Sequence, residues 1–155
     1  MWDYKKKLRS AIPASIAAFT VISVLSYISL NTSHGYILAV SFGASMVLLF
    51  GFPSSNFAQP KNIFFGHVLT SISGLIFTYI SLPLFIALAA SVAIGIFMMI
   101  MLDLVHPPAG GNPIAIILGG YTYDFLFTTI ILGTIIIIFL GIVINNFILK
   151  IKYPN

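Results

Sequence analysis

Long apolar runs, separated by short polar breaks, dominate this chain and predict an all-α fold. A helix needs about 20 mainly apolar residues to cross the hydrocarbon layer of a bilayer. Runs of roughly that length cover residues 11–30, 36–52, 62–81, 84–102 and 123–149. The pattern predicts a polytopic helical membrane protein with about five transmembrane helices, in a single domain over residues 1–155. We expect Pro13 in the first turn of the first helix, where proline is tolerated.

The short apolar segment 113–120 does not fit a full crossing. Eight helical residues rise about 12 Å, which is less than half of a hydrocarbon core of roughly 30 Å. Our leading interpretation is a re-entrant half-helix beside five full spans. The alternative is that this segment and the loop before it form a broken crossing. The two alternatives place the C-terminus on opposite sides of the membrane.

Composition supports membrane insertion and excludes an ordinary soluble domain. Hydrophobic residues make up 59% of the chain and charged residues 6%, whereas soluble domains average about 25% charged residues. The net charge is +4, and Lys5, Lys6, Lys7 and Arg9 precede the first apolar run. This placement predicts a cytoplasmic N-terminus in the inner (cell) membrane. It does not favour a nucleic-acid partner, because no soluble part carries a basic surface.

Small residues at helical spacing predict close packing between helices. Ala87, Ser91 and Gly95 recur every four residues in the fourth run, and Ala39 and Gly43 do so in the second. Small side chains allow two helix backbones to approach each other in a membrane.

The segment 103–113 concentrates polar and backbone-breaking residues between two apolar stretches. Asp103 and His106 are three residues apart, so they can meet on one helical turn and hold a proton or orient the imidazole. The alternative for Asp103 is a structural role at the helix end. Pro107, Pro108 and Gly110 fix the direction of the loop. His67 lies near the start of the third run, where it either joins this site or serves as a packing histidine.

A similar loop precedes the third run and suggests a two-helix repeat. This first loop is bounded by Pro53 and Pro60, and the second by Pro107 and Pro113. Each launches a helical run, and with two spans between them both loops lie on one side of the membrane. We expect the loops to meet inside the bundle.

Two predicted helix N-termini at these loops indicate a binding site for an anion. We expect Lys61 and Asn62 to begin one helix and Asn112 to cap the next, since asparagine before proline is typical of a helix start. Helix N-termini attract anions, and Lys61 adds a positive charge. Ser54, Ser55 and Gln59 are further candidate contacts to the substrate. The alternative is that both helices are simply well capped.

No pattern for enzymatic chemistry or a cofactor is present. The chain has no cysteine, and its histidines, including His34, are far apart in the sequence. Ser45 beside Gly43 lacks the nucleophile-elbow pattern of hydrolases. We therefore expect no metal, no cofactor and no enzyme, although an intramembrane enzyme using Asp103 and His106 is a third alternative.

Four ordered sequence blocks resemble the HPP family of small integral membrane proteins. They are Phe42–Ser45, Pro53–Ser55 with Ala58–Asn62, Gly66–His67 and Asp103–Gly110, the last containing the His-Pro-Pro triplet. The resemblance implies a bundle of four or five membrane helices. It also implies nitrite transport, as in chloroplast relatives. Where many members have Ala-Thr after this block, this chain has Gly111 and Asn112.

The residues and the resemblance together predict a transporter or channel for a small monovalent anion, with nitrite the leading candidate. We expect protonated His106 to attract the anion and Asp103 to hold the imidazole. A homo-oligomer is expected, because five helices make a thin wall around a pathway. The alternative function is a membrane scaffold or assembly protein whose loops only lock the fold.

Overall fold

The computed structural model describes residues 4–31 and 38–155, and every regular element in that part of the chain is helical. The turn with His34 lies outside the described residues. The elements are α1 (Tyr4–Asn31), α2 (Val40–Met46), η1 (Val47–Gly51), η2 (Asn56–Ala58), α3 (Pro60–Thr78), α4 (Leu84–Met101), η3 (Pro107–Gly111), α5 (Asn112–Gly119), α6 (Tyr123–Phe125), η4 (Leu126–Ile131), α7 (Leu132–Val143) and η5 (Ile144–Ile148).

The helix bounds follow the apolar runs closely. Three helices are long and apolar enough to cross a membrane, over Lys7–Asn31, Leu84–Met101 and Tyr123–Ile148. The last of these is continuous through α6, η4, α7 and η5. The second predicted run is a shorter apolar helix, Val40–Gly51. The total of about five crossings stays a prediction.

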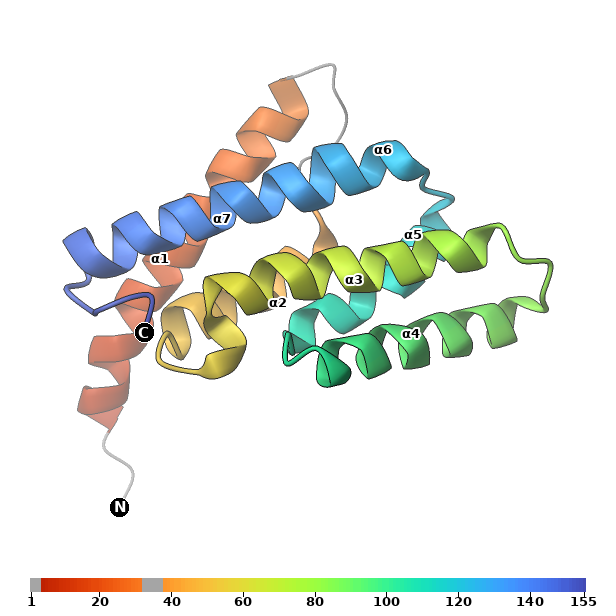
Figure 1. The fold of residues 1–155 in the computed structure, drawn as a ribbon. Helices are drawn as coiled ribbons and strands as arrows, with labels where there is room; N and C mark the ends of the chain where they lie inside the picture. Colours follow the sequence, from red (N-terminus) through yellow and green to blue (C-terminus); the bar gives the residue numbers. More distant parts are fainter. Residues whose placement is uncertain (1–3, 32–37) are drawn as a thin grey trace.

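Helix α3 forms the centre of the bundle and carries more buried polar side chains than any other described helix. It contacts α4, α5 and α7, and it runs between α4 and α7 in Figure 1. Asn62, His67, Thr70, Ser71 and Ser73 are all buried on this helix. A polar helix with this many protein neighbours keeps its polar side chains away from lipid.

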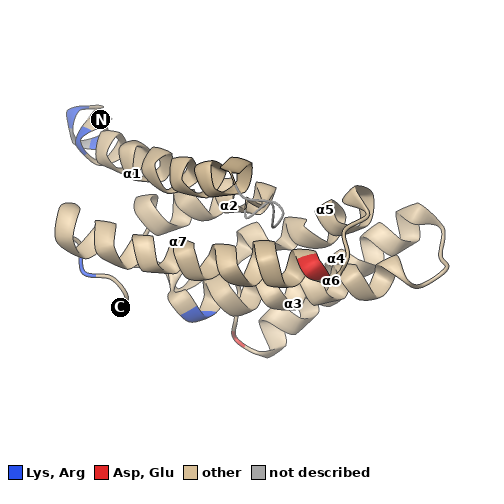
Figure 2. Cartoon of the chain, turned by 90° about the horizontal axis from the view of Figure 1, so that it is seen from above, with Lys and Arg blue, Asp and Glu red and all other residues tan. Residues whose placement is uncertain are grey.

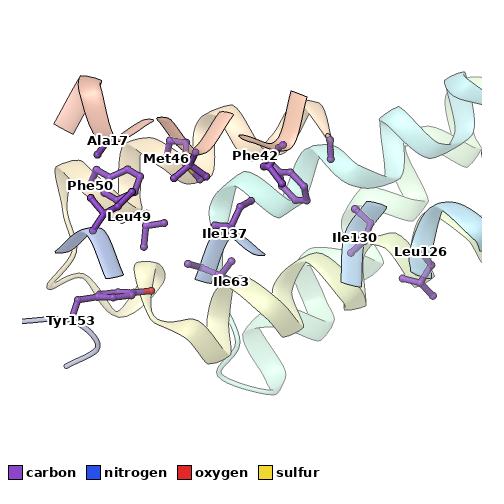
Figure 3. Close-up of a cluster of buried hydrophobic side chains, with 14 of the residues drawn as sticks. Ala17, Phe42, Met46, Leu49, Phe50, Ile63, Leu126, Ile130, Ile137 and Tyr153 are labelled. Atoms are coloured by element: carbon purple, nitrogen blue, oxygen red, sulfur yellow. The ribbon is translucent and has the colours of Figure 1, made fainter. Parts of the chain in front are cut away.

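An apolar core joins α1 to the rest of the bundle (Figure 3). Ala17, Val21 and Leu25 recur every four residues on α1 and are buried. They belong to the same cluster as Phe42 of α2 and Ile137 of α7. The gain from such a core inside a bilayer comes from close packing of side chains. The outward face of α1 remains exposed, as at Phe19, which is 73% exposed.

The expected position of Pro13 is wrong. Helix α1 begins at Tyr4, so Pro13 lies inside it. The ring nitrogen of Pro13 cannot donate to the carbonyl of Arg9, one turn earlier. The basic residues that precede the apolar run are therefore the first turns of the helix. The hydrophobic pattern does not reveal this early start.

The small-residue stripe of α4 packs as predicted, whereas Gly43 does not. Ala87, Ser91 and Gly95 are buried, and a Cβ on Gly95 would lie 3.2 Å from Thr70 Cγ2 of α3. The Ser73 hydroxyl donates to the Ser91 carbonyl at 2.7 Å. Gly43, in contrast, has open space where a Cβ would be.

The two chain ends lie toward the same end of the molecule in Figures 1 and 2. The lysine and arginine segments gather toward that end as well (Figure 2). The choice between a re-entrant piece and a broken crossing at 113–120 stays a prediction.

Candidate functional site

Seven polar side chains meet inside the bundle and form what we call the polar cluster. They come from α2, α3, the start of α5 and the loop after α4. All are buried except Ser41, which is half-buried. The members are Ser41, Ser45, His67, Thr70, Ser71, His106 and Asn112. The predicted site residues His67, His106 and Asn112 are thus brought together.

Ser45 bridges the two histidines. Its Oγ lies 3.0 Å from His67 Nε2 and 2.9 Å from His106 Nε2. The two imidazole rings are 5.0 Å apart between centroids. The rings of Phe42 and His67 are nearly perpendicular, with their centroids 5.2 Å apart. A single hydroxyl therefore connects the loop after α4 with the centre of α3.

Asn112 holds the other side of His67 and does not cap a helix, contrary to prediction. It is the first residue of α5, whose N-cap position is Gly111. Its Nδ2 lies 2.9 Å from His67 Nδ1 and 3.1 Å from Ser71 Oγ. The hydroxyl of Ser41 donates to Asn112 Oδ1 at 2.6 Å. In sequence, a capping asparagine and one that points into a core look alike.

Carbonyl groups, which can only accept, fix the direction of these hydrogen bonds. His106 Nδ1 lies 2.6 Å from the Phe57 carbonyl, so Nδ1 carries a proton. In the neutral ring, His106 Nε2 then accepts from Ser45. Asn112 Nδ2 donates to the His67 carbonyl at 3.3 Å, which sets the amide orientation. His67 Nδ1 therefore accepts, and His67 Nε2 donates to Ser45.

His106 has no counter-charge among the described residues. It is buried, and its ring nitrogens contact the Ser45 hydroxyl and the Phe57 carbonyl. The ion pair at this end of the bundle joins Lys61 and Asp103 instead. A buried imidazolium without a counter-charge loses its hydration. Protonated His106 stays a prediction.

The two proline-bounded loops meet, as predicted. His106 contacts the Phe57 carbonyl of the first loop, and Asn62 Nδ2 donates to the Val105 carbonyl at 2.9 Å. Each loop contains a short 3₁₀ turn, η2 in the first and η3 in the second. The two-helix repeat itself stays a prediction. Pro60 lies in the first turn of α3, and Pro107 begins η3.

Asp103 does not hold the imidazole of His106, which corrects the predicted pair. Its carboxylate lies 3.3 Å from Lys61 Nζ, with 93% of the Asp103 side chain exposed. Its φ of 54° is left-handed, and Leu104 N–H donates to the Met99 carbonyl. This is the Schellman ending of a helix. Asp103 therefore ends α4, and Lys61 stays at the surface.

The polar residues of the first loop stabilise the loop itself. Ser55 Oγ accepts from the Phe57 N–H and caps η2. Gln59 Nε2 donates to the Pro53 and Ser55 carbonyls. Ser54 is exposed. None of these three side chains belongs to the polar cluster.

The last residues of the chain close over the same loop. The Tyr153 hydroxyl donates to the Ala58 carbonyl at 2.7 Å, and the Asn155 N–H donates to Gln59 Oε1. Tyr153 lies beside this loop in Figure 3. Burial raises the pKa of Tyr153.

A cleft of about 440 Å³ opens at the N-terminus of α3. Lys61, Asn62, Asp103 and Asn155 are among its lining residues. Asn62 is 3% exposed, and its Oδ1 has no partner among the described residues. Asn62 also donates to the carbonyl of Val105, the residue before His106.

Sequence reasoning missed the hydroxyl members of the cluster. Ser41 and Ser45 are four residues apart, and Thr70 and Ser71 follow His67 by one turn. That spacing is the signal that could have indicated one buried polar face. In the described part of the chain, no three histidine, cysteine or acidic side chains come together as a metal site.

Comparisons with known proteins agree with this architecture. A family model described as "HPP, transmembrane region" matches residues 3–154. Two transmembrane proteins of Dictyostelium discoideum are 30% and 28% identical over 149 residues. The matches cover 91% of this chain but 52% and 48% of the relatives, so the chain spans about half their length. No solved structure matches the chain.

The family match covers nearly the whole chain, and the His-Pro-Pro triplet lies where the two loops meet the polar cluster. Its relatives are named as transmembrane proteins. The chain is a membrane protein and belongs to the HPP family.

Proposed function

We propose that this protein carries a small monovalent anion across the membrane, with nitrite the leading candidate. The observation that supports the proposal is the buried polar cluster. Burying polar side chains inside a membrane bundle costs free energy, and such side chains mark the paths of ions and solutes. Helices α2, α4, α5 and α7 contain no ionisable residue, so these helices place no fixed charge beside the cluster.

The donors of the cluster suit a small anion. The Ser45 hydroxyl and the Asn112 amide are neutral donors, and Asn112 lies in the first turn of α5. The backbone N–H groups in the first turn of a helix have no acceptor within the helix, and they favour a negative charge nearby. A small planar anion can bind such groups without a fixed cation. Nitrite itself is proposed from the family resemblance.

The cleft at the start of α3 provides the approach. Lys61 lies at its rim, more than half exposed, where it attracts anions without pairing permanently in the interior. Asn62 lines this cleft and binds the carbonyl of Val105, the residue before His106. The proposed order of contact for the anion is Lys61, then Asn62, then the polar cluster.

Flux measurements in proteoliposomes test the proposal. Purified wild type should pass nitrite faster than protein-free vesicles, which report leakage of the neutral acid. His106→Asn keeps a donor for the Phe57 carbonyl but removes Nε2, and His67→Gln removes Nδ1. Both variants should lose flux while retaining a folded, monodisperse state. Ser73→Ala is the matched control, because Ser73 is a buried serine outside the cluster. Wild-type flux no faster than that of protein-free vesicles would reject the proposal.

The alternative is a non-transporting membrane scaffold, and one observation favours it. The cluster is closed by its own hydrogen bonds, and Tyr153 fastens the first loop over it. In that case the same variants lower thermal stability, and no anion in a panel of nitrite, nitrate, formate and chloride passes above background.

We further propose a cytoplasmic N-terminus in the inner membrane and a homo-oligomer. Basic residues gather at the end with both termini, as the positive-inside rule requires of a cytoplasmic face. The exposed apolar side chains Ile16 and Phe19 on α1 give a surface for lipid or a second copy. Fluorescent fusions at the C-terminus test the orientation.

A further inference from the structure

We infer that one proton accompanies each anion, held on His106 Nε2, and that the Ser45 hydroxyl turns to make room for it. This inference rests on the proposed function and adds a proton-binding role to the same cluster. The basis is the position of Ser45 between two histidines and a carbonyl.

Two hydrogen-bond arrangements are open to the Ser45 hydroxyl. In the neutral cluster its proton points to His106 Nε2, 2.9 Å away. A second acceptor, the Ser41 carbonyl, lies 3.2 Å from the same Oγ. Rotation about the Cβ–Oγ bond moves the hydroxyl proton from the first acceptor to the second without moving the backbone.

Protonation of His106 uses the second arrangement. A proton added to the lone pair of Nε2 makes this atom a donor, and Ser45 Oγ becomes its acceptor. Ser45 then accepts from the Nε2–H groups of both histidines and donates to Ser41. Every polar atom keeps a partner, and the proton leaves by the same lone pair when the hydroxyl turns back.

The cluster has room for one such proton. The remaining lone pair of His67 is on Nδ1, which accepts from Asn112 Nδ2. A second proton there would put two donors face to face. The Asn112 amide cannot turn over to solve this, because its Oδ1 would then face the His67 carbonyl, to which Nδ2 now donates at 3.3 Å.

Charge balance explains why proton and anion bind together. The titratable group that faces His106 is His67 on α3, and the groups from α2 and the first loop are the Ser45 hydroxyl and the Phe57 carbonyl. Lys61 and Asp103 pair with each other at the surface. An imidazolium alone or an anion alone is therefore a buried unpaired charge. Bound together they form a neutral pair, in which each stabilises the other.

Simultaneous measurement of nitrite and proton uptake tests the coupling. Wild type and Ser73→Ala should take up one proton per nitrite after subtraction of protein-free vesicles. Ser45→Ala has no acceptor for the protonated Nε2 and should lose the coupled uptake, by at least about tenfold. Nitrite uptake without protons would overturn this inference and leave the proposed function standing. No nitrite uptake by wild type would overturn both.

A second measurement does not depend on transport. Nuclear magnetic resonance of ¹⁵N-histidine-labelled protein should find His106 protonated on Nδ1 and His67 on Nε2 without ligand, with His34→Gln to remove the third signal. Saturating sodium nitrite should raise the apparent pKa of His106 by at least about one unit, a tenfold change in proton affinity. The rise should persist in Ser73→Ala and vanish in Ser45→Ala. An unchanged His106, or a rise that survives in Ser45→Ala, would contradict the inference.

Discussion

The backbone of Gly66 lies directly against the side chain of His106. A Cβ at Gly66 would come within 2.8 Å of His106 Cβ and 3.1 Å of the Leu104 carbonyl. Such contact is closer than real Cβ atoms tolerate, and neither neighbour is the far end of a flexible chain. The absence of a side chain at Gly66 therefore allows the second loop to reach α3 and bring His106 to Ser45.

Gly66→Ala should displace the His-Pro-Pro loop. Overpacking a tight contact costs about 1–3 kcal/mol, so we expect a lower free energy of unfolding and loss of nitrite flux. Thermal unfolding in detergent and proteoliposome flux measure the two effects. Gly43→Ala is the control, since its Cβ would meet open space. That variant should be as stable as wild type or more so, by up to about 1 kcal/mol. Equal behaviour of the two variants would show that the Gly66 contact is unimportant.

Asp103→Gly separates a helix-ending role from a functional one. Asp103 has a left-handed backbone, which glycine adopts without strain. Its surface ion pair with Lys61 contributes about 0–1 kcal/mol. We therefore expect Asp103→Gly to be as stable as wild type and to retain flux. Asp103→Val should destabilise the end of α4, because a β-branched residue resists this conformation. Loss of flux in a stable Asp103→Gly variant would instead assign the carboxylate a role in transport.

The sequence allowed prediction of the helices because apolar length alone determines a membrane helix. Runs such as 84–102 had few competing interpretations, and α4 spans Leu84–Met101. The meeting of the two loops was also predictable, from their similar prolines. The position of Pro13 was predicted wrongly because the apolar pattern starts after the basic residues. The helix itself begins earlier, at Tyr4.

The connections within the site were not predictable, because they depend on directions of side chains. Asp103 and His106 have the spacing of a helical pair, but the helix ends between them and the carboxylate points outward. Ser45 looks like a packing serine until two histidines from distant segments reach it. Asn112 resembles a cap because the same residue type suits both roles. Only the packing of α2, α3 and the two loops decides among these alternatives.

Asn112→Ala should destabilise the protein more than an ordinary surface change. The amide joins Ser41, His67 and Ser71, so its loss leaves several buried polar atoms unpaired. Each unpaired group costs about 1–3 kcal/mol, and we expect a total loss of about 2–4 kcal/mol. Asn31→Ala is the matched control, because Asn31 is exposed and its amide donates to the Tyr27 carbonyl. Its effect should stay within about 0.5 kcal/mol. Chemical unfolding of the two variants beside wild type measures the difference, and similar losses would refute the central place of Asn112.

Tyr153 should make the folded protein less stable at alkaline pH. Burial raises the pKa of Tyr153 in the folded state, while the unfolded residue titrates near about 10. The contribution to stability is therefore fully present below about pH 10 and is lost as the pH rises above it. The thermal unfolding temperature of wild type should fall steeply as the pH rises above that value. Tyr153→Phe should start about 1–3 kcal/mol less stable, because the Ala58 carbonyl loses its donor, and should then show a shallower decline. Tyr27→Phe, at an exposed position, should follow the wild-type curve. Parallel curves for wild type and Tyr153→Phe would mean that the hydroxyl does not hold the C-terminal segment on the first loop.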